Sequence, residues 1–252
     1  MAPEDAAGDD SLGTVIERCA CESVFDKKPC DFYPEGTLQD AITEKVVQCY
    51  MWEDGGDLDA DDQELVRFIL SKAKKLFAIA TAIHFEFEKL RKVMALFKNN
   101  GICDEILNSP PQTTSTDPDA VHSDPWPDLL ATLEPANTGR KKLWNSRRIK
   151  SFESKRWEFL APVFSPTKMS YDLPSLCILP FISKGAASKN GSFGSVRKYE
   201  IHQNHIELVS LMSASGDRAI IKHRSLTFHL SGAADLFLLL RSQGNSAKFR
   251  PQ

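Results

Sequence analysis

Two glycines and an aromatic residue stand close together in a segment that could approach a phosphate group. The segment reads Gly191-Ser192-Phe193-Gly194-Ser195-Val196. Strand-like runs precede it at 177–182 and follow it at 199–202, so we expect a strand–turn–strand with the glycines at the turn. Because glycine has no Cβ, the backbone there can come close to phosphate oxygens and direct its amides at them. Phe193 could cover the tip and Val196 could pack on an adenine ring; the alternative is an ordinary glycine-containing hairpin.

A lysine follows at the end of a second apolar, strand-like run, Ala219-Ile-Ile-Lys222. In protein kinases, a lysine in this position binds the α/β-phosphates of the nucleotide and pairs with a helix glutamate. Strands that end in lysine are common, so Lys222 carries weight only together with the glycine segment. The two segments predict a nucleotide site made of Gly191, Ser192, Phe193, Gly194, Val196 and Lys222.

Three amphipathic helices are predicted between residues 37 and 106. Thr37 and Asp40 have the spacing of a capping box at the start of the first helix. Asp61 or Asp62 can cap the second, and Gly101 is a natural stop for the third. Their apolar positions, three or four residues apart, are Leu38, Ile42, Val46, Val47, Cys49 and Tyr50; Leu65, Ile69, Ala73, Leu76, Ala80 and Ile83, widened by Phe68, Phe77 and Ile79; and Leu90, Val93, Met94 and Phe97. Because apolar stripes need a partner surface, the helices should pack on one another in a module of residues 37–106.

The segments outside this module differ in composition. Residues 1–36 mix Gly, Asp and Pro without a sustained period and predict a flexible, acidic lead-in. Residues 107–140 contain six prolines and predict a linker with one helical turn at 129–133. Near the end, the pattern favours a helix over 231–241, with an apolar run at 236–240 and Gly244 as its stop.

Several segments occur in an order that is more specific than any one of them. They read Lys72-Ala-Lys-Lys-Leu-Phe-Ala-Ile-Ala80, Met94-Ala-Leu-Phe-Lys98, Gly101-Ile-Cys-Asp-Glu105, Arg156-Trp-Glu-Phe-Leu-Ala-Pro-Val-Phe164, Ile178-Leu-Pro-Phe181, Gly191-Ser-Phe-Gly194 and Ile201-His202. Over residues 37–202 the chain therefore resembles the N-terminal part of fungal serine/threonine-kinase-like proteins that carry a helical leader before the kinase domain. This resemblance implies ATP binding by the loop glycines and Lys222, and protein phosphorylation by a complete domain.

The sequence also departs from the family pattern. The family loop reads Gly-x-Gly-x-Phe-Gly-x-Val, and Lys189 occupies the position of its first glycine. No glutamate follows Glu207 as a partner for Lys222, and Asp235 is only a shorter stand-in. His-Arg-Asp and Asp-Phe-Gly segments, which position the attacking hydroxyl and the metal ions, are absent from these 252 residues.

From these departures we expect a truncated or degenerate kinase-like protein, a pseudokinase that binds ATP weakly, does not hold Mg²⁺ and is inactive alone. A truncated or mis-spliced gene product would explain why residues after about 206 fit the family poorly. The alternative is a non-enzymatic helical module that binds another protein.

Other residues invite further chemistry. Cys19, Cys21 and Cys30 could contribute to a zinc site, but a fourth ligand would have to come from Cys49 or farther away, so we expect ordinary reduced thiols. The basic and aromatic block at 140–164 could bind nucleic acid. We favour a solvated linker whose aromatic side chains dock on the strands that follow. The histidines at 202, 205, 223 and 229 are expected on the surface or in loops.

Composition places few further limits. Hydrophobic residues at 42%, charged residues at 26% and a net charge of −3 are ordinary for a globular protein. Neither an apolar run of about 20 residues nor a signal-peptide pattern is present, so we expect an intracellular protein, cytoplasmic or nuclear, with no membrane or nucleic-acid partner. The predicted fold class is α+β: a helical module, a proline-rich linker, and an incomplete β-rich segment at 141–252 resembling a kinase small lobe.

Overall fold

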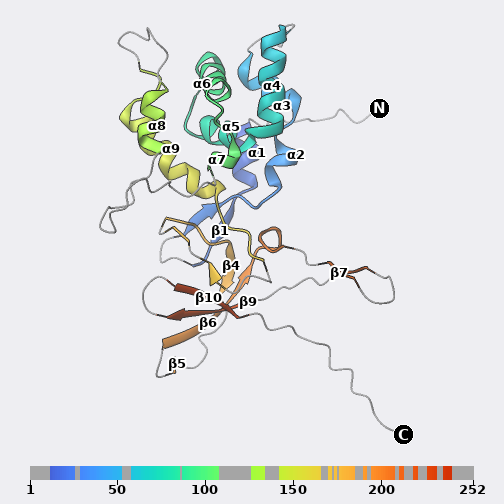
Figure 1. The fold of residues 1–252 in the computed structure, drawn as a ribbon, viewed down its shortest axis with the longest axis vertical. Coiled ribbons are helices and arrows are strands. Elements are labelled where there is room, and N and C mark those ends of the chain that lie inside the picture. Colours follow the sequence, from blue (N-terminus) through green and yellow to red (C-terminus); the bar gives the residue numbers. More distant parts are fainter. Residues whose placement is uncertain are drawn as a thin grey trace, which may run out of the picture. The chain divides into compact units, whose positions relative to one another are not determined.

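A computed structural model of the protein describes residues 12–25, 29–52, 58–85, 87–107, 126–133, 142–165, 170–171, 173–174, 176–184, 190–191, 194–207, 210–212, 218–220, 226–231 and 235–239. The chain divides into two units (Figure 1). The first contains residues 1–20 and 36–160, and the second contains residues 21–35 and 161–252. The described residues combine helices with antiparallel strands, which agrees with the predicted α+β class.

The first unit is helical. Its helices are α1 (Leu12–Arg18), α2 (Thr37–Ala41), α3 (Glu44–Met51), α4 (Ala60–Lys72), α5 (Lys74–Ala82), α6 (Phe87–Asn99), α7 (Asp104–Leu107), α8 (Trp126–Thr132) and α9 (Ser146–Arg156), followed by the 3₁₀ turn η1 (Trp157–Phe159). Among the described residues, no helix is long and apolar enough to cross a membrane.

The first predicted helix is two helices in the structure. α2 begins after Gly36, which has a left-handed φ of 85° and no side-chain cap. α3 begins after Thr43, whose hydroxyl accepts the amide proton of Val46. The predicted capping box at Thr37 is therefore wrong, because Gly36 occupies the N-cap position of α2 and no side chain caps that helix. The hydroxyl that does cap a helix belongs to Thr43, six residues later.

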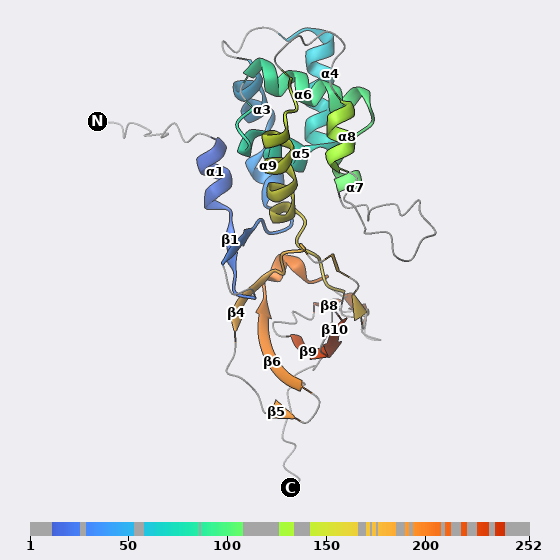
Figure 2. The same cartoon turned by 90° about the vertical axis from the view of Figure 1, so that its left-hand side faces the viewer.

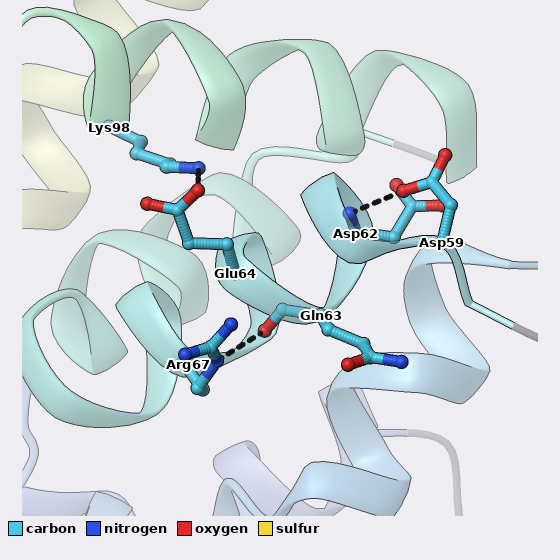
Figure 3. A network of polar contacts seen from close by, with 6 residues as sticks. All are labelled: Asp59, Asp62, Gln63, Glu64, Arg67 and Lys98. Carbon is cyan, nitrogen blue, oxygen red and sulfur yellow. Dashed lines mark hydrogen bonds and ion pairs between the residues drawn. The ribbon is translucent and has the colours of Figure 1, made fainter.

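The second predicted helix is also divided, into α4 and α5. The break falls at Ala73, where φ is −141° and ψ is 33°. Asp59, and not Asp61 or Asp62, caps α4: its carboxylate accepts the amide proton of Asp62 at 2.8 Å (Figure 3). Although the helix is interrupted, all six positions of the predicted stripe from Leu65 to Ile83 are buried, because both pieces keep that face toward the core.

The start of α5 receives a cap from a distant residue. Ala73 has no side-chain acceptor, and the Asp104 carboxylate instead accepts the amide protons of Lys75 at 2.9 Å and Leu76 at 3.0 Å. Burial raises the pKa of Asp104 and outweighs the opposing effect of these bonds. A partly buried carboxylate thus satisfies amides that the first turn of a helix leaves without partners.

The third predicted helix is confirmed by α6, and its apolar positions Leu90, Val93, Met94 and Phe97 are fully buried. Gly101 ends it with φ at 66°. The amide of Gly101 donates to the Lys98 carbonyl and that of Ile102 to the Phe97 carbonyl, which are the two bonds of a Schellman motif. A salt bridge of 2.9 Å joins Lys98 to Glu64 of α4 and lowers the pKa of Glu64 (Figure 3).

Aromatic side chains complete the core of the helical unit. Phe152 of α9 lies 5.2 Å from the ring of Trp126 in α8 and 5.7 Å from that of Trp144. Trp144 also packs on Phe97, at 6.0 Å. The prediction that the aromatic residues of 140–164 dock on the following strands is wrong for Trp144 and Phe152, which pack on helices. Of the predicted linker at 107–140, Leu107 is the buried last residue of α7, and α8 at Trp126–Thr132 is followed by the buried Leu133. Residues 108–125 and 134–140 lie outside the described ranges.

The second unit is built from short antiparallel strands. They are β1 (Cys21–Ser23), β2 (Cys30–Phe32), β3 (Ser170–Tyr171), β4 (Phe181–Lys184), β5 (Asn190–Gly191), β6 (Gly194–Ile201), β7 (Ser210–Met212), β8 (Arg218–Ile220), β9 (Leu226–Ser231) and β10 (Asp235–Leu239), with the 3₁₀ turn η2 (Gln203–His205). The main sheet has the order β3-β10-β9-β6-β4, and β5 also pairs with β6. Its core consists of Phe164, Leu179, Phe181, Tyr199, Ile201 and Ile206.

Two predictions for this part of the chain differ from the structure. The predicted helix at 231–241 is wrong, because β9 and β10 occupy this region and Asp235 pairs with Ser231. A short continuous apolar run fits a strand inside a sheet as well as a helix, so periodicity does not separate them. The predicted lead-in instead contains α1, β1 and β2, and Phe32 of β2 is fully buried.

Candidate functional site

The predicted strand–turn–strand is the end of one long hairpin. Phe181 of β4 pairs with Ile201 of β6, and Lys184 pairs with Tyr199. Further along the same strand, β5 pairs with the opposite end of β6. Figure 2 shows β4 beside one end of the curved β6 and β5 at its other end. Residues 181–184 and 190–191 thus run antiparallel to a single eight-residue strand.

Glycines face each other where this hairpin turns. Gly191 pairs with Gly194, and Asn190 pairs with Ser195. The register leaves two residues between the glycines, Ser192 and Phe193, which lie outside the described ranges. The structure therefore places Gly191 and Gly194 together at the turn, as predicted from their spacing. Val196 lies two residues into β6, where its backbone pairs with His229 of β9.

The glycine turn lies far from the hydrophobic core along the hairpin. β9 pairs with β6 only over Val196–Tyr199. Among the described strands, only β5 pairs with Gly194 and Ser195. At the other end of β6, Tyr199 and Ile201 are buried. Seven residue steps separate Ile201 from Gly194, which is about 23 Å for an extended strand. The core thus anchors one end of the hairpin, and its glycines lie at the opposite end.

The strand that leads to Lys222 lies in a different sheet from the glycines. β8 pairs with β7, through Ser210↔Ile220 and Met212↔Arg218. Within the described strands, no pairing joins β8 to β6. Lys222 itself lies outside the described ranges, so its position relative to Gly191 and Gly194 stays a prediction.

Residues near the N-terminus pack against the anchored end of this hairpin. The Ser23 hydroxyl donates to the Leu179 carbonyl at 2.6 Å, and the Val24 amide donates to the Phe181 carbonyl at 2.8 Å. The ring of Phe25 lies 5.4 Å from that of Phe181 and 5.6 Å from that of Tyr199. Sequence reasoning missed these residues, because three-residue strands are too short to show a period.

Two histidines lie close to this end of the hairpin. His205 lies in the turn η2, within the predicted alternatives of a surface or a loop, but it is fully buried and not on the surface. Its Nε2 accepts the amide proton of Glu35 at 3.2 Å, and its Nδ1 lies 3.0 Å from the Pro162 carbonyl oxygen. A carbonyl can only accept, so the neutral tautomer with hydrogen on Nδ1 satisfies both bonds. His202 is partly exposed, and burial lowers its pKa from 6.5.

The six cysteines are free thiols. Burial raises the pKa of Cys177 to about 11, so its thiol stays protonated at neutral pH and is a poor metal ligand. In the part of the chain that the structure describes, no three His, Cys, Asp or Glu side chains converge on a point where a metal ion could bind. The zinc hypothesis for Cys19, Cys21 and Cys30 gains no support from this geometry.

Comparisons with known proteins give no match to a family model, to a curated protein or to a solved structure.

Proposed function

We propose that this chain is a kinase-like protein that binds ATP at the glycine turn of the β4–β6 hairpin and does not transfer its phosphate alone. The observation that supports this proposal is the pairing of Gly191 with Gly194 across a two-residue connection. The assignment of ATP comes from the family resemblance described above.

Phosphate binding at this turn would use backbone amides. Glycines on both strands leave no Cβ between the turn and a ligand, so phosphate oxygens can approach the main chain. Lys222 is proposed to supply a positive charge for the same phosphates. The sequence contains no His-Arg-Asp or Asp-Phe-Gly segment, so we assign binding, and not phosphoryl transfer, to these residues.

Thermal unfolding in the presence of ATP tests this proposal. A ligand at one hundred times its dissociation constant stabilises the folded protein by about 2.7 kcal/mol, which raises the unfolding temperature measurably. We expect this rise in the unmodified protein and its loss in Lys222→Ala and in the double variant Gly191→Val, Gly194→Val. Lys150→Ala, an exposed change in α9 of the helical unit, is the matched control and should keep it. No rise at millimolar ATP would contradict the proposal.

A second candidate function, binding of an acidic protein segment by the helical unit, is favoured by the outer face of α9. Arg147 and Lys150 are exposed there, and neither forms an ion pair with another described residue. Unlike α4, α9 has no acidic residue in its first turn. A fluorescent glutamate-rich peptide should bind and be released by salt. Replacing Arg147 and Lys150 together by alanine should abolish this binding, and equal binding by that variant would exclude this face.

A further inference from the structure

A short helix from the proline-rich stretch packs on α9 through one apolar face. α8 lies beside α9 in the helical unit (Figure 1). Its apolar residues at positions i, i+4 and i+7 are buried: Trp126 is 2% exposed, Leu130 is 0% exposed, and Leu133, directly after the helix, is 5% exposed. Ala131, in contrast, is exposed. This is the pattern by which an amphipathic peptide helix binds to a protein surface.

Three residues form the surface that Trp126 contacts, and we call Trp144, Phe152 and Arg156 the receptor face. The ring of Trp126 lies 5.2 Å from that of Phe152, and the guanidinium carbon of Arg156 lies 5.5 Å from the centroid of the same Trp126 ring. Arg156 also lies 4.8 Å from the ring of Trp157. Trp144 packs on Phe152 at 5.7 Å. All three residues of the receptor face are buried.

The contact between α8 and the receptor face has the composition of a binding interface. Tryptophan and arginine are the residue types that most often dominate the energy of such interfaces. Burying the guanidinium of Arg156, which is 4% exposed, costs free energy, and its contacts with two indole rings offset part of that cost. An aliphatic side chain would fill the same space without this cost but would not distinguish an aromatic ring from a leucine. Arg156 therefore makes the receptor face selective for a helix that carries an aromatic ring at the matching position.

From these contacts we infer that the receptor face binds a short amphipathic helix of another protein, and that α8 occupies this site in the free chain. The chemistry of the partner follows from α8: a tryptophan with leucines four and seven positions later. Because α8 belongs to the same chain, its effective concentration at the receptor face is about millimolar, so the partner must displace it. This site is separate from the glycine turn, and it uses a different face of α9 from the exposed Arg147 and Lys150.

Binding of a peptide to the full chain tests this inference. The probe is a fluorescent peptide with the sequence of residues 124–135. The opened variant, Trp126→Ala with Leu130→Ala, removes two anchors of α8 and should bind the probe at least about tenfold more tightly than the unmodified chain. Within the probe, Trp126→Ala should abolish binding, and Ala131→Gln, at the exposed position, should preserve it. Failure of a folded opened variant to bind the probe would overturn the inference.

A double-mutant cycle tests whether the probe binds at the receptor face. In the opened variant, Arg156→Leu should weaken binding of the probe by about fivefold, because one cation–π contact is lost. The same substitution should have much less effect on a probe in which leucine replaces Trp126. Lys150→Ala, an exposed change in α9, is the matched control and should leave the binding of both probes unchanged. Equal effects of Arg156→Leu on the two probes would show that the probe binds elsewhere, which would overturn the inference.

A second measurement applies if circular dichroism shows that the opened variant is unfolded. Protease sites inserted within residues 108–125 and 134–141 of the otherwise unmodified chain allow α8 to be cut free. Uptake of the probe by the cut chain, and not by the uncut chain, would support the inference. Retention of α8 against an excess of probe would overturn it. Light scattering of the unmodified chain tests the other occupant: a dimer that the probe dissociates would assign the site to a second copy and overturn its assignment to another protein.

Discussion

At the scale of single residues, the buried imidazole of His205 joins three separate stretches of the second unit. Its ring nitrogens contact Glu35 and Pro162, and its own carbonyl accepts the amide proton of Phe164 at 2.8 Å. No apolar side chain reproduces both ring contacts, since one nitrogen must accept and the other donate. A histidine that the sequence suggests is incidental is thus a fixed part of the structure.

Replacing His205 by leucine should lower the free energy of unfolding by about 1–3 kcal/mol, because it leaves the two partner groups without a hydrogen bond. Chemical denaturation followed by circular dichroism measures this change. Gln203→Ala, an exposed substitution two residues away, should be nearly neutral. Equal stability of the His205→Leu variant and the unmodified protein would show that these contacts do not contribute.

The neighbouring His202 should make the stability of the second unit depend on pH. Burial lowers its pKa from 6.5, so in acid the unfolded chain takes up the proton more readily than the folded one. Its contribution is fully present above the ordinary pKa and is lost as the pH falls through the lowered value. We expect a lower unfolding free energy at about pH 5 than at about pH 7.5. The difference should shrink in His202→Gln; an unchanged difference would assign it to other groups.

At the scale of elements, two helices end in the same motif with different residues at the left-handed position. α6 ends at Gly101, and α5 ends at His84, which has a φ of 63°. The amide of His84 donates to the Thr81 carbonyl, and that of Phe85 donates to the Ala80 carbonyl. Side chains other than glycine adopt this conformation at a cost of about 1–2 kcal/mol. Replacing the glycine at the end of α6 should therefore lower stability, whereas introducing a glycine at the end of α5 should raise it.

Gly101→Ala should lower the unfolding free energy by about 1 kcal/mol, and His84→Gly should raise it by up to about 1 kcal/mol. A Cβ at position 101 would meet no atom within 4 Å, so the loss would come from the backbone alone. His84 is exposed, so little packing is removed with its side chain. Thermal unfolding measures the change in stability of each variant. A lower unfolding free energy in both variants would refute the conformational explanation.

The sequence predicts the faces of the helices better than their ends. Leu65, Ala73 and Ile83 are buried as their spacing suggests, yet the helix breaks at Ala73, an excellent helix former. The break accompanies a cap from Asp104, a residue about thirty positions away that no local pattern indicates. The position of Gly191 and Gly194 at a turn was predictable, because their spacing of three residues is a local signal. The contacts of Ser23 and Phe25 were not predictable, because their partners lie more than 150 residues away in the sequence.

At the scale of the whole molecule, the chain passes between the two units three times, after residues 20, 35 and 160. The second unit therefore contains residues from both sides of the segment 36–160, the larger part of the helical unit. A boundary placed at residue 141 by composition would separate β1 and β2 from the sheet whose edge they cover. Fragments designed from the sequence pattern alone would thus be incomplete.

Deleting residues 1–35 from the full chain should expose the backbone of β4 and promote self-association. The deletion removes the donors to the Phe181 and Leu179 carbonyls, together with the Phe25 ring that covers Phe181 and Tyr199. An uncovered edge strand is a template for pairing with another chain. Light scattering during size-exclusion chromatography should therefore detect larger species than for the full chain. Deleting residues 1–11, which leaves α1 and the strand pair in place, is the matched control. If both shortened chains form particles with the same number of subunits as the full chain, residues 21–35 do not protect this edge.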